Sequence, residues 1–471
     1  MISRIAALSL WAAAATLMPI AVTGQTASVT LTAEDMRVLA QDLLNAGDPA
    51  GARDVAGALL DRNPNDVPAL IFGAQAALEQ NQPRAAVPLA TRAFRKADDD
   101  TARYVAARLA ARAHAELLQD TRAQVWLRLA REYAPDARNA LSVAEDYAFL
   151  RERNPLSVSL SFGISPSSNI NNGSKSETAE LFGQSFYLSQ SAQALSGVGF
   201  SIGANLQYRV RSYEGEATFV DVDVSKTTYA LSSESLDRLN QDYLAAQQAG
   251  RDTSDIERSG SDFSDAQLSF GLTHRRILNG AASPTTFAAR LGQNWYGGDV
   301  YQQFLNAGVS HSFAIAERSR VNVNASAQQQ WGTSNYQDAQ SLSFGVSYRH
   351  LLENGNLIGL SFGNRNSRSR DAERDYNAVQ VGASLDLAEP IYDVRFGFGV
   401  NLEQRDYDYS FYTTGPRTDR TVSLRVSALF EAVEYFGFQP VATFSAGRTY
   451  SDAGRFDLEY ANVGLDVRSS F

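Results

Sequence analysis

The sequence predicts an α+β multidomain protein, in which an N-terminal α-helical repeat domain precedes a 14-stranded antiparallel transmembrane β-barrel. From about residue 156 onwards, apolar and polar residues alternate with a period of two, whereas residues 33–151 have helical spacing. No stretch after residue 24 approaches 18 apolar residues, so no transmembrane helix is available. A chain that spans a bilayer without such a helix needs a closed barrel, because the hydrocarbon core cannot solvate open sheet edges.

Composition and charge exclude several classes of protein. The 471 residues include no Cys and carry a net charge of −10. Without Cys the chain has no disulfide framework and no Cys-linked lipid anchor. The negative charge and the absence of a basic tail argue against nucleic acid as a partner.

Residues 1–24 read MISRIAALSLWAAAATLMPIAVTG, with one Arg before an apolar run and small residues at the end. This pattern predicts a signal peptide for export. A helical membrane anchor is the alternative, but Pro19 and the small residues that follow favour cleavage.

Residues 25–154 are expected to form a helical domain in the periplasm. A turn at 45–48 is followed 34 residues later by a similar turn at 81–83, and a looser copy begins at 118–120. Paired helices at this period resemble tetratricopeptide repeats; a generic helical bundle is the alternative. The resemblance implies a concave surface that binds segments of other proteins. The basic residues of this domain are Arg84, Arg92, Arg95, Arg103, Arg108, Arg112, Arg122, Arg128 and Arg131.

Residues 155–471 are expected to form the barrel. The predicted strands are 156–165, 197–209, 214–225, 265–275, 285–296, 302–313, 320–331, 339–349, 356–365, 375–387, 391–403, 419–430, 436–448 and 459–471. Fourteen is an even number, as in bacterial single-chain barrels. The predicted long connections, 166–196, 226–264, 404–418 and 449–458, all follow odd-numbered strands. A soluble β-sandwich would not explain this rhythm together with a signal peptide.

The last strand, 461–471, reads ANVGLDVRSSF and ends on an aromatic residue. Its apolar residues lie on one face, and its length suits a tilted crossing of a bilayer. Phe471 resembles the assembly signal of outer-membrane barrels, which implies a barrel assembly machinery as a partner. We expect a monomeric barrel.

Several charged residues lie on the faces of strands that point away from lipid. The predicted lumen-lining residues are Arg290, Arg349, Arg395, Arg425, Arg468, Asp386, Glu403 and Asp466, and Asp221 and Asp223 have the same phase. A charge at such a position is tolerated because it faces the lumen. Two interpretations stay open: these groups pair across the interior and brace the barrel, or they line a translocation path.

No motif predicts catalysis or a cofactor. The four histidines are scattered without metal-ligand spacing, and no nucleophile elbow or phosphate-binding loop is present. We therefore predict neither an enzyme nor a bound metal; a dispersed Ser/His pair is the alternative.

A short motif follows the first strand: Ser168, Asn169, Ile170, Asn171 and Asn172. On its own it predicts a turn, since Asn tolerates left-handed backbone. Behind a helical repeat domain and before a fourteen-stranded barrel, however, it resembles the surface lipoprotein assembly modifier family. The resemblance spans about residues 33–471 and implies an outer-membrane protein that moves client proteins, often lipoproteins, to the cell surface.

The functional hypothesis is therefore an outer-membrane translocon. It would capture a secreted protein or lipoprotein in the periplasm and deliver it outward. A polysaccharide export porin and a passive porin are the alternatives. Three repeats are few for the first, and a helical periplasmic domain is superfluous for the second.

Overall fold

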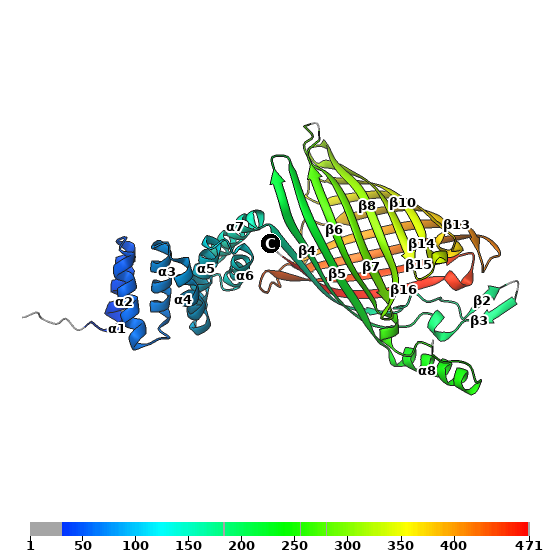
Figure 1. Ribbon diagram of the computed structural model, residues 1–471, viewed down its shortest axis with the longest axis horizontal. Helices are drawn as coiled ribbons and strands as arrows, with labels where there is room; N and C mark the ends of the chain where they lie inside the picture. Colours follow the sequence, from blue (N-terminus) through cyan, green and yellow to red (C-terminus); the bar gives the residue numbers. More distant parts are fainter. Residues whose placement is uncertain (1–30, 182–183, 255, 279, 470–471) are drawn as a thin grey trace, which may run out of the picture.

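The computed structural model places a row of helices at one end of a closed β-barrel (Figure 1). It describes residues 31–181, 184–254, 256–278 and 280–469, so the predicted signal peptide (1–24) and Phe471 lie outside the described part. Within that part, no helix has both the length and the apolar character that a membrane crossing requires.

The helical part contains seven helices within the described residues. They are α1 (Ala33–Asn45), α2 (Pro49–Arg62), α3 (Val67–Glu79), α4 (Pro83–Lys96), α5 (Asp100–Glu116), α6 (Asp120–Glu132) and α7 (Ala137–Arg153). The sequence sets most of their starts. The side chains of Thr32, Asp48, Asp66, Asp99 and Asp136 each accept a hydrogen bond from the first turn of the helix that follows.

The repeat is visible in the backbone of the turns. Gly47, Asn81 and Leu118 occupy equivalent turns between paired helices, and all three have positive φ, at 77°, 57° and 58°. Their spacing of 34 and then 37 residues matches two regular repeats and a looser third. Only Gly adopts this conformation without cost, so Leu118 is strained.

Alanine dominates the interior of the helical part. Ala74, Ala77, Ala86, Ala90 and Ala110 are completely buried in one cluster between successive helices. Their small side chains let neighbouring helices pack closely, which produces the regular stack in Figure 1. A larger cluster around Tyr104, Leu127 and Tyr147 fills the end nearest the barrel.

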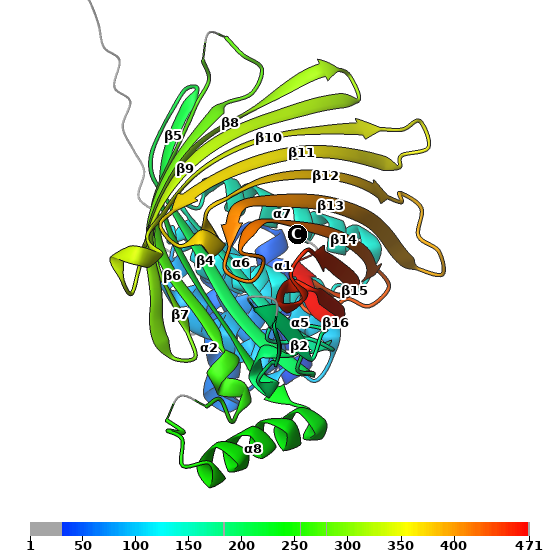
Figure 2. The same ribbon diagram turned by 90° about the vertical axis from the view of Figure 1, so that its right-hand side faces the viewer.

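The barrel is closed and antiparallel (Figure 2). Its strands are β1 (Leu156–Ser167), β4 (Gly197–Tyr213), β5 (Glu216–Leu231), β6 (Asp265–Arg276), β7 (Thr285–Tyr296), β8 (Asp299–Ala316), β9 (Ser319–Gly332), β10 (Ala339–Leu351), β11 (Leu357–Ser369), β12 (Tyr376–Asp386), β13 (Val394–Ser410), β14 (Gly415–Phe430), β15 (Phe438–Ser451) and β16 (Leu458–Ser469). Each pairs with its neighbours in the chain, and β1 pairs with β16 to close the ring. The predicted fold class is confirmed.

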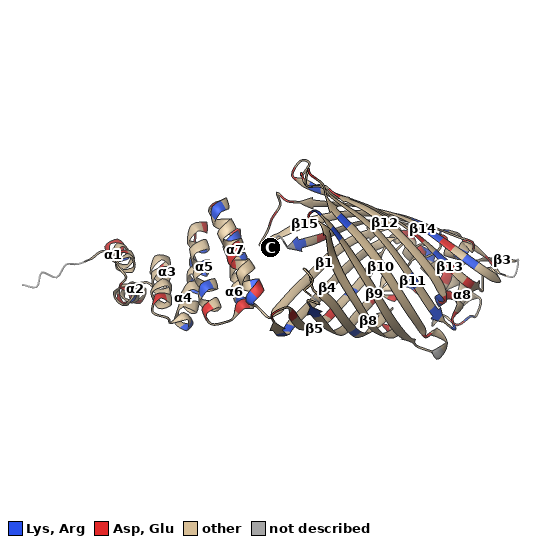
Figure 3. Ribbon diagram, turned by 90° about the horizontal axis from the view of Figure 1, so that it is seen from above, with Lys and Arg blue, Asp and Glu red and all other residues tan. Residues whose placement is uncertain are grey.

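The two faces of the wall follow the period-two pattern. Leu160, Phe200, Phe270, Leu342 and Leu424 point outward and are about half exposed. Their sequence neighbours on the inner face are mostly Ser, Gly, Asn and Gln. Charged residues gather towards the ends of the barrel, most densely at the end farther from the helices (Figure 3). This is the pattern of a wall that has lipid outside and water inside.

The strand ends differ from the prediction. Residues 404–418 and 449–458 are not long loops, because β13 and β14 leave only 411–414 between them and β15 and β16 only 452–457. These strands continue past the apolar band, where water replaces lipid and polar residues on both faces are no obstacle to pairing.

The connections 168–196 and 232–264 are long, as predicted, but they are not structureless. The first contains a separate hairpin of β2 (Thr178–Leu181) and β3 (Gln184–Tyr187) and the short helix η1 (Gln190–Ala192). The second contains α8 (Ser233–Gln248) and η2 (Gly260–Phe263). The elements β2, β3 and α8 lie together at the end of the barrel away from the helical part (Figure 1).

Candidate functional site

The helical part has a groove between α5 and α7, over α6, with a volume of about 450 Å³. Its lining is Tyr104, Val105, Arg108, Leu109, Ala111, Arg112, Ala115, Leu127, Asp146, Phe149, Leu150 and Arg153. Phe149 is 63% exposed, although it is a large apolar side chain. The lining holds three Arg and one Asp, and each Arg has an acidic partner, namely Asp146, Glu116 or Asp120. A groove of this kind suits an apolar side chain that is flanked by acidic groups.

Hydrogen bonds hold the groove arginines in place. Arg108 Nη2 lies 2.6 Å from Asp146 Oδ2, and its Nη1 donates to the hydroxyl of Tyr104. Arg153 donates to Asp120 and, over 2.9 Å, to the carbonyl oxygen of Ala115. The basic rim is therefore fixed before any ligand binds.

Helix α7, which lines the groove, continues almost directly into the first barrel strand. Only Asn154 and Pro155 separate α7 from β1. The buried Asn154 side chain donates to the hydroxyl of Thr121 over 3.0 Å and accepts from the backbone amide of Leu156. Arg209 of β4 donates to the carbonyl oxygens of Glu152 and Arg153 at 2.8 and 2.9 Å. The two parts are thus joined without a flexible linker.

A second contact connects α6 with the turn between β14 and β15. Arg131 Nη2 lies 3.0 Å from Glu434 Oε2, and Glu132 Oε2 accepts from the backbone amide of Phe436 over 2.7 Å. The Arg128 guanidinium lies 4.6 Å from the centroid of the Phe438 ring. The sequence analysis identified Arg128 and Arg131 only as basic residues of the helical domain and missed their role as barrel contacts. Only knowledge of the tertiary arrangement reveals it.

The strand register places all eight predicted lumen residues on the inner face. Two of the arginines pair with acids: Arg290 lies 3.7 Å from Asp223, which shares the inward phase of the predicted set, and Arg395 lies 2.6 Å from Glu431, which was not in that set. Glu403 pairs with Arg405 of its own strand at 2.6 Å. Within the described residues, no ion pair involves Arg349, Arg425, Arg468, Asp386 or Asp466. Among the described residues, Arg290 and Asp223 are the pair that joins two members of the inward-facing set, so bracing and a translocation path both stay open as interpretations.

Two of these carboxylates lie over glycines instead. The Asp466 carboxylate covers Gly163 of β1, and the Asp386 carboxylate covers Gly397 of β13. A Cβ at either glycine would lie less than 3.0 Å from the carboxylate oxygen. The glycines therefore make room for the acids on the inner wall.

Hollows on the inner face are polar. One of about 480 Å³ is lined by Ser159, Ser161, Asn205, Asp223 and Arg290, among others. Another, of about 590 Å³, is lined by residues that include Asn169, Asn172, Asn401, Arg425 and Asn462. Amides and hydroxyls dominate both, so the lining offers hydrogen bonds without a strong net charge.

The Ser168–Asn172 motif builds the far end of the barrel. Asn171 donates to the carbonyl oxygens of Ser191 and Gln193 at 2.7 and 2.8 Å. Ile170 is buried with Leu195, Leu239 of α8 and Phe263. The motif therefore ties the first long connection to the second, and it does so with the Asn side chains that the sequence singled out.

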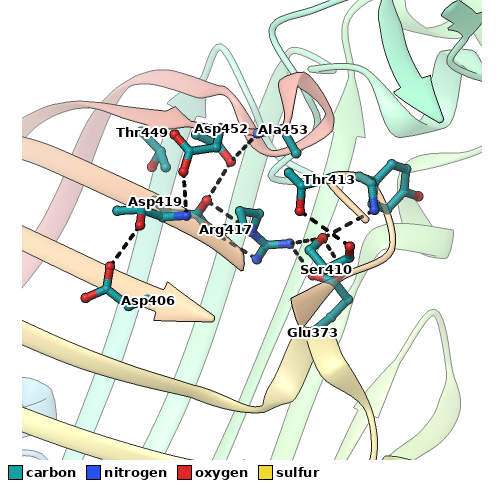
Figure 4. A network of polar contacts seen from close by, with 12 residues as sticks. Glu373, Asp406, Ser410, Thr413, Arg417, Asp419, Thr449, Asp452 and Ala453 are labelled. Atoms are coloured by element: carbon teal, nitrogen blue, oxygen red, sulfur yellow. Dashed lines mark hydrogen bonds and ion pairs between the residues drawn. The ribbon is translucent and has the colours of Figure 1, made fainter. Parts of the chain in front are cut away.

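A buried arginine that sequence reasoning missed lies near the same end. Arg417 of β14 is 2% exposed, and its guanidinium lies 3.7 Å from the ring centroids of both Tyr407 and Phe456. It also contacts Glu373, Ser410 and Asp419 (Figure 4). Four segments thereby meet at one side chain. The inward phase of Arg417 was the available signal, but residues 404–418 were expected to be a loop.

The histidines do not gather into a metal site. His274, His311 and His350 each bond a neighbouring hydroxyl, at 3.0, 2.9 and 2.8 Å. Within the part of the chain that the structure describes, no group of His, Asp and Glu has the arrangement of metal ligands.

A closed fourteen-stranded wall, apolar outside and polar inside, defines an outer-membrane β-barrel, here with helical repeats fused to its first strand. The family model described as "Surface lipoprotein assembly modifier" matches residues 263–471. This confirms the resemblance over the strands from β6 to β16. The fold is that of an outer-membrane barrel.

Solved structures are similar to parts of this chain at low identity and low TM-score. OccAB3 of Acinetobacter baumannii has 8% identity and a TM-score of 0.35 over 66% of this chain and 98% of its own. A "Bacterial polysaccharide outer membrane secretin" has 8% identity and a TM-score of 0.33 over 66% and 98%. The yeast Sti1 TPR2AB domain in complex with pHSP90 has 21% identity and a TM-score of 0.23 over 26% and 45%. No curated protein matches the sequence.

Proposed function

We propose that this protein is an outer-membrane translocon that captures client proteins in the periplasm and delivers them to the cell surface. The clients are secreted proteins or surface lipoproteins. The observation that carries the proposal is the rigid fusion of a groove to one mouth of a barrel. The last lining residue of the groove, Arg153, lies three residues before the first strand.

The chemistry of the groove supports a protein segment as its ligand. Phe149 presents an exposed aromatic ring, and Arg108 and Arg112 flank the apolar floor. An apolar anchor with acidic neighbours would bury the ring and meet the arginines. Capture should weaken as salt rises, because the arginines are only partly buried and are screened.

Deletion of residues 33–150 tests the proposal. The surface proteins of intact cells are labelled and compared among strains with the full chain, the deleted chain and no chain. We expect the barrel without residues 33–150 to insert normally. We also expect this strain to lose from its surface the same proteins that the strain without the chain loses. Full display from the barrel alone would reject the capture role.

A matched pair of substitutions locates the binding site in the full chain. Phe149→Ala removes the ring from the groove, whereas Leu141→Ala removes an equally exposed side chain of α7 (64% against 63%) that does not line it. We expect F149A to weaken capture about tenfold and L141A to leave it unchanged. Equal effects of the two would place the client elsewhere.

A further inference from the structure

Within the described residues, the ladder between β1 and β16 is shorter than the ladder on either side of it. β1 pairs with β4 over its whole length, from Leu156 to Ser167. β16 pairs with β15 from Leu458 to Ser469. Between β1 and β16, however, the ladder comprises Gly163–Asp466, Ile164–Leu465 and Ser167–Asn462. In this register 160–162 of β1 would face 467–469 of β16, and no pair is present there; the register partners of 156–159 lie beyond 469, outside the described residues.

The far end of the seam is fastened. Ser168 and Ala461 exchange two hydrogen bonds, with Ser168 N donating to Ala461 O at 3.0 Å and Ala461 N to Ser168 Oγ at 2.9 Å. Asn169 donates to the carbonyl oxygen of Glu459, whose carboxylate pairs with Lys175. The seam is thus closed at the far end and open at the end near the helices.

The open edge lies within the apolar band of the wall. Val158, Leu160 and Phe162 point outward and are 44%, 53% and 49% exposed. Backbone amides and carbonyls at that depth have no water to bond, so an unpaired edge is costly there. Residues 156–162 contain no Pro, no charge and no bulge, the devices that usually protect an edge.

We propose that this edge is a docking site for one extended segment of the exported client, which adds as a strand between β1 and β16. The inference rests on the proposed function. Ser159 and Ser161 border the polar hollow that holds Asn205 and Arg290. A suitable segment therefore alternates, with polar residues towards the hollow and apolar residues towards lipid.

The helical part lies where it would present such a segment. α7 continues into β1, on one side of the seam, and α6 binds the β14–β15 turn, on the other side. The order of strands around the ring is β1, β16, β15, β14, so these two attachments flank the open end. A client held in the groove is thus close to the edge.

Photo-cross-linking tests the edge without any client. Phe162 or Phe270 is replaced by p-benzoylphenylalanine in the full chain, which is held in lipid nanodiscs. The two side chains are about equally exposed, at 49% and 51%. Phe270 is the control, because its strand is paired on both sides. The probe is a biotinylated peptide that copies residues 461–469, with a scrambled peptide as control. We expect labelling at position 162 by the alternating peptide only. No labelling, or equal labelling at 270, would overturn the proposal, and so would cross-linked pairs of chains without peptide.

A disulfide across the seam tests its role in export, because the chain has no other Cys. If the ladder continued in the same register from Gly163–Asp466 towards the start of β1, Ser161 would face Arg468. We expect oxidised S161C/R468C to lose display of the proteins that depend on the chain, and reductant to restore it. The lumen-facing pair S347C/S361C, on the fully paired strands β10 and β11, should retain display.

The outcomes of the two proposals are distinguishable. If the oxidised S161C/R468C protein displays its clients at the full level, strand docking is rejected, but capture by the helices is not. If removal of the whole chain changes no surface protein, the translocon proposal fails, and the peptide experiment still decides whether the edge accepts a strand.

Discussion

Single side chains fix the relative positions of elements that are distant in the sequence. Asp66 is 5% exposed, caps α3 through Ala69 N at 3.1 Å and lies 2.8 Å from Arg37 of α1. Burial alone would raise the pKa of Asp66, but the hydrogen bonds from Arg37 and Ala69 outweigh it and lower that pKa. The folded state therefore favours the ionised carboxylate.

We expect Asp66→Asn to destabilise the helical part by about 1–2 kcal/mol at neutral pH, because Asn still caps a helix but loses the charge. Since the folded pKa is depressed, this contribution is present above the unfolded pKa, near 3.9, and disappears as the pH falls through the folded pKa. Urea unfolding, monitored by the circular dichroism of the helices, should show that the difference in unfolding free energy between the two proteins shrinks as the pH falls. Asp54→Asn, at an exposed site, is the control.

Arg417 should resist even a conservative change. Lys keeps the charge, but it cannot stack between Tyr407 and Phe456 or reach both acids with a planar fork. We expect R417K to loosen the loops at 370–375 and 452–457, so that a protease cuts them faster in intact cells. Arg420→Lys, on the outer face of the same strand, should not. Equal cutting would show that the stacked guanidinium is dispensable.

At the scale of elements, the sequence predicted the existence of strands better than their ends. Alternation revealed all fourteen barrel strands because each has one face in lipid. The ends of β13 and β14 were missed because that contrast disappears outside the bilayer. Helix α8 was missed although Leu236, Leu239 and Ala246 have helical spacing, since a polar loop was expected there.

The turns of the repeats make a sharp prediction. Leu118 has a φ of 58° and is 78% exposed, so Leu118→Gly should stabilise the helical part by about 1 kcal/mol. Gly47→Ala, in the equivalent turn with nothing within 4 Å of the new Cβ, should destabilise it by a similar amount. Thermal melting of both variants measures the difference. Shifts of the same sign would refute the argument from backbone strain.

At the scale of the whole molecule, the sequence predicted which face of the wall a side chain lies on, but not which side chains of other strands it contacts. Alternation places Arg290 inside, yet its acidic partner Asp223 lies two strands away, on β5. The Arg290 side chain lies over Gly271 of the intervening strand β6, a position set by the strand register, which sequence spacing does not specify. The short ladder between β1 and β16 was unpredictable for the same reason, since it depends on register.

The orientation in the membrane can be tested with single cysteines, because the chain contains none. Ala245→Cys lies on an exposed face of α8, and Asp54→Cys on an exposed face of α2. A maleimide that cannot cross membranes should label the first in intact cells and the second only after the outer membrane is opened. The reverse pattern would place the helices outside.

Under the proposed function, the stiff join at Asn154 and Pro155 sets the effective concentration of a captured segment at the barrel mouth. A twenty-residue Gly/Ser insertion there would be a flexible linker with a root-mean-square end-to-end distance of roughly 25 Å, so the groove could move relative to the barrel. The same bound client would then meet the mouth less often, although its affinity for the groove is unchanged. Under that proposal the rate of delivery depends on this geometry, so lengthening the join should slow export without weakening capture.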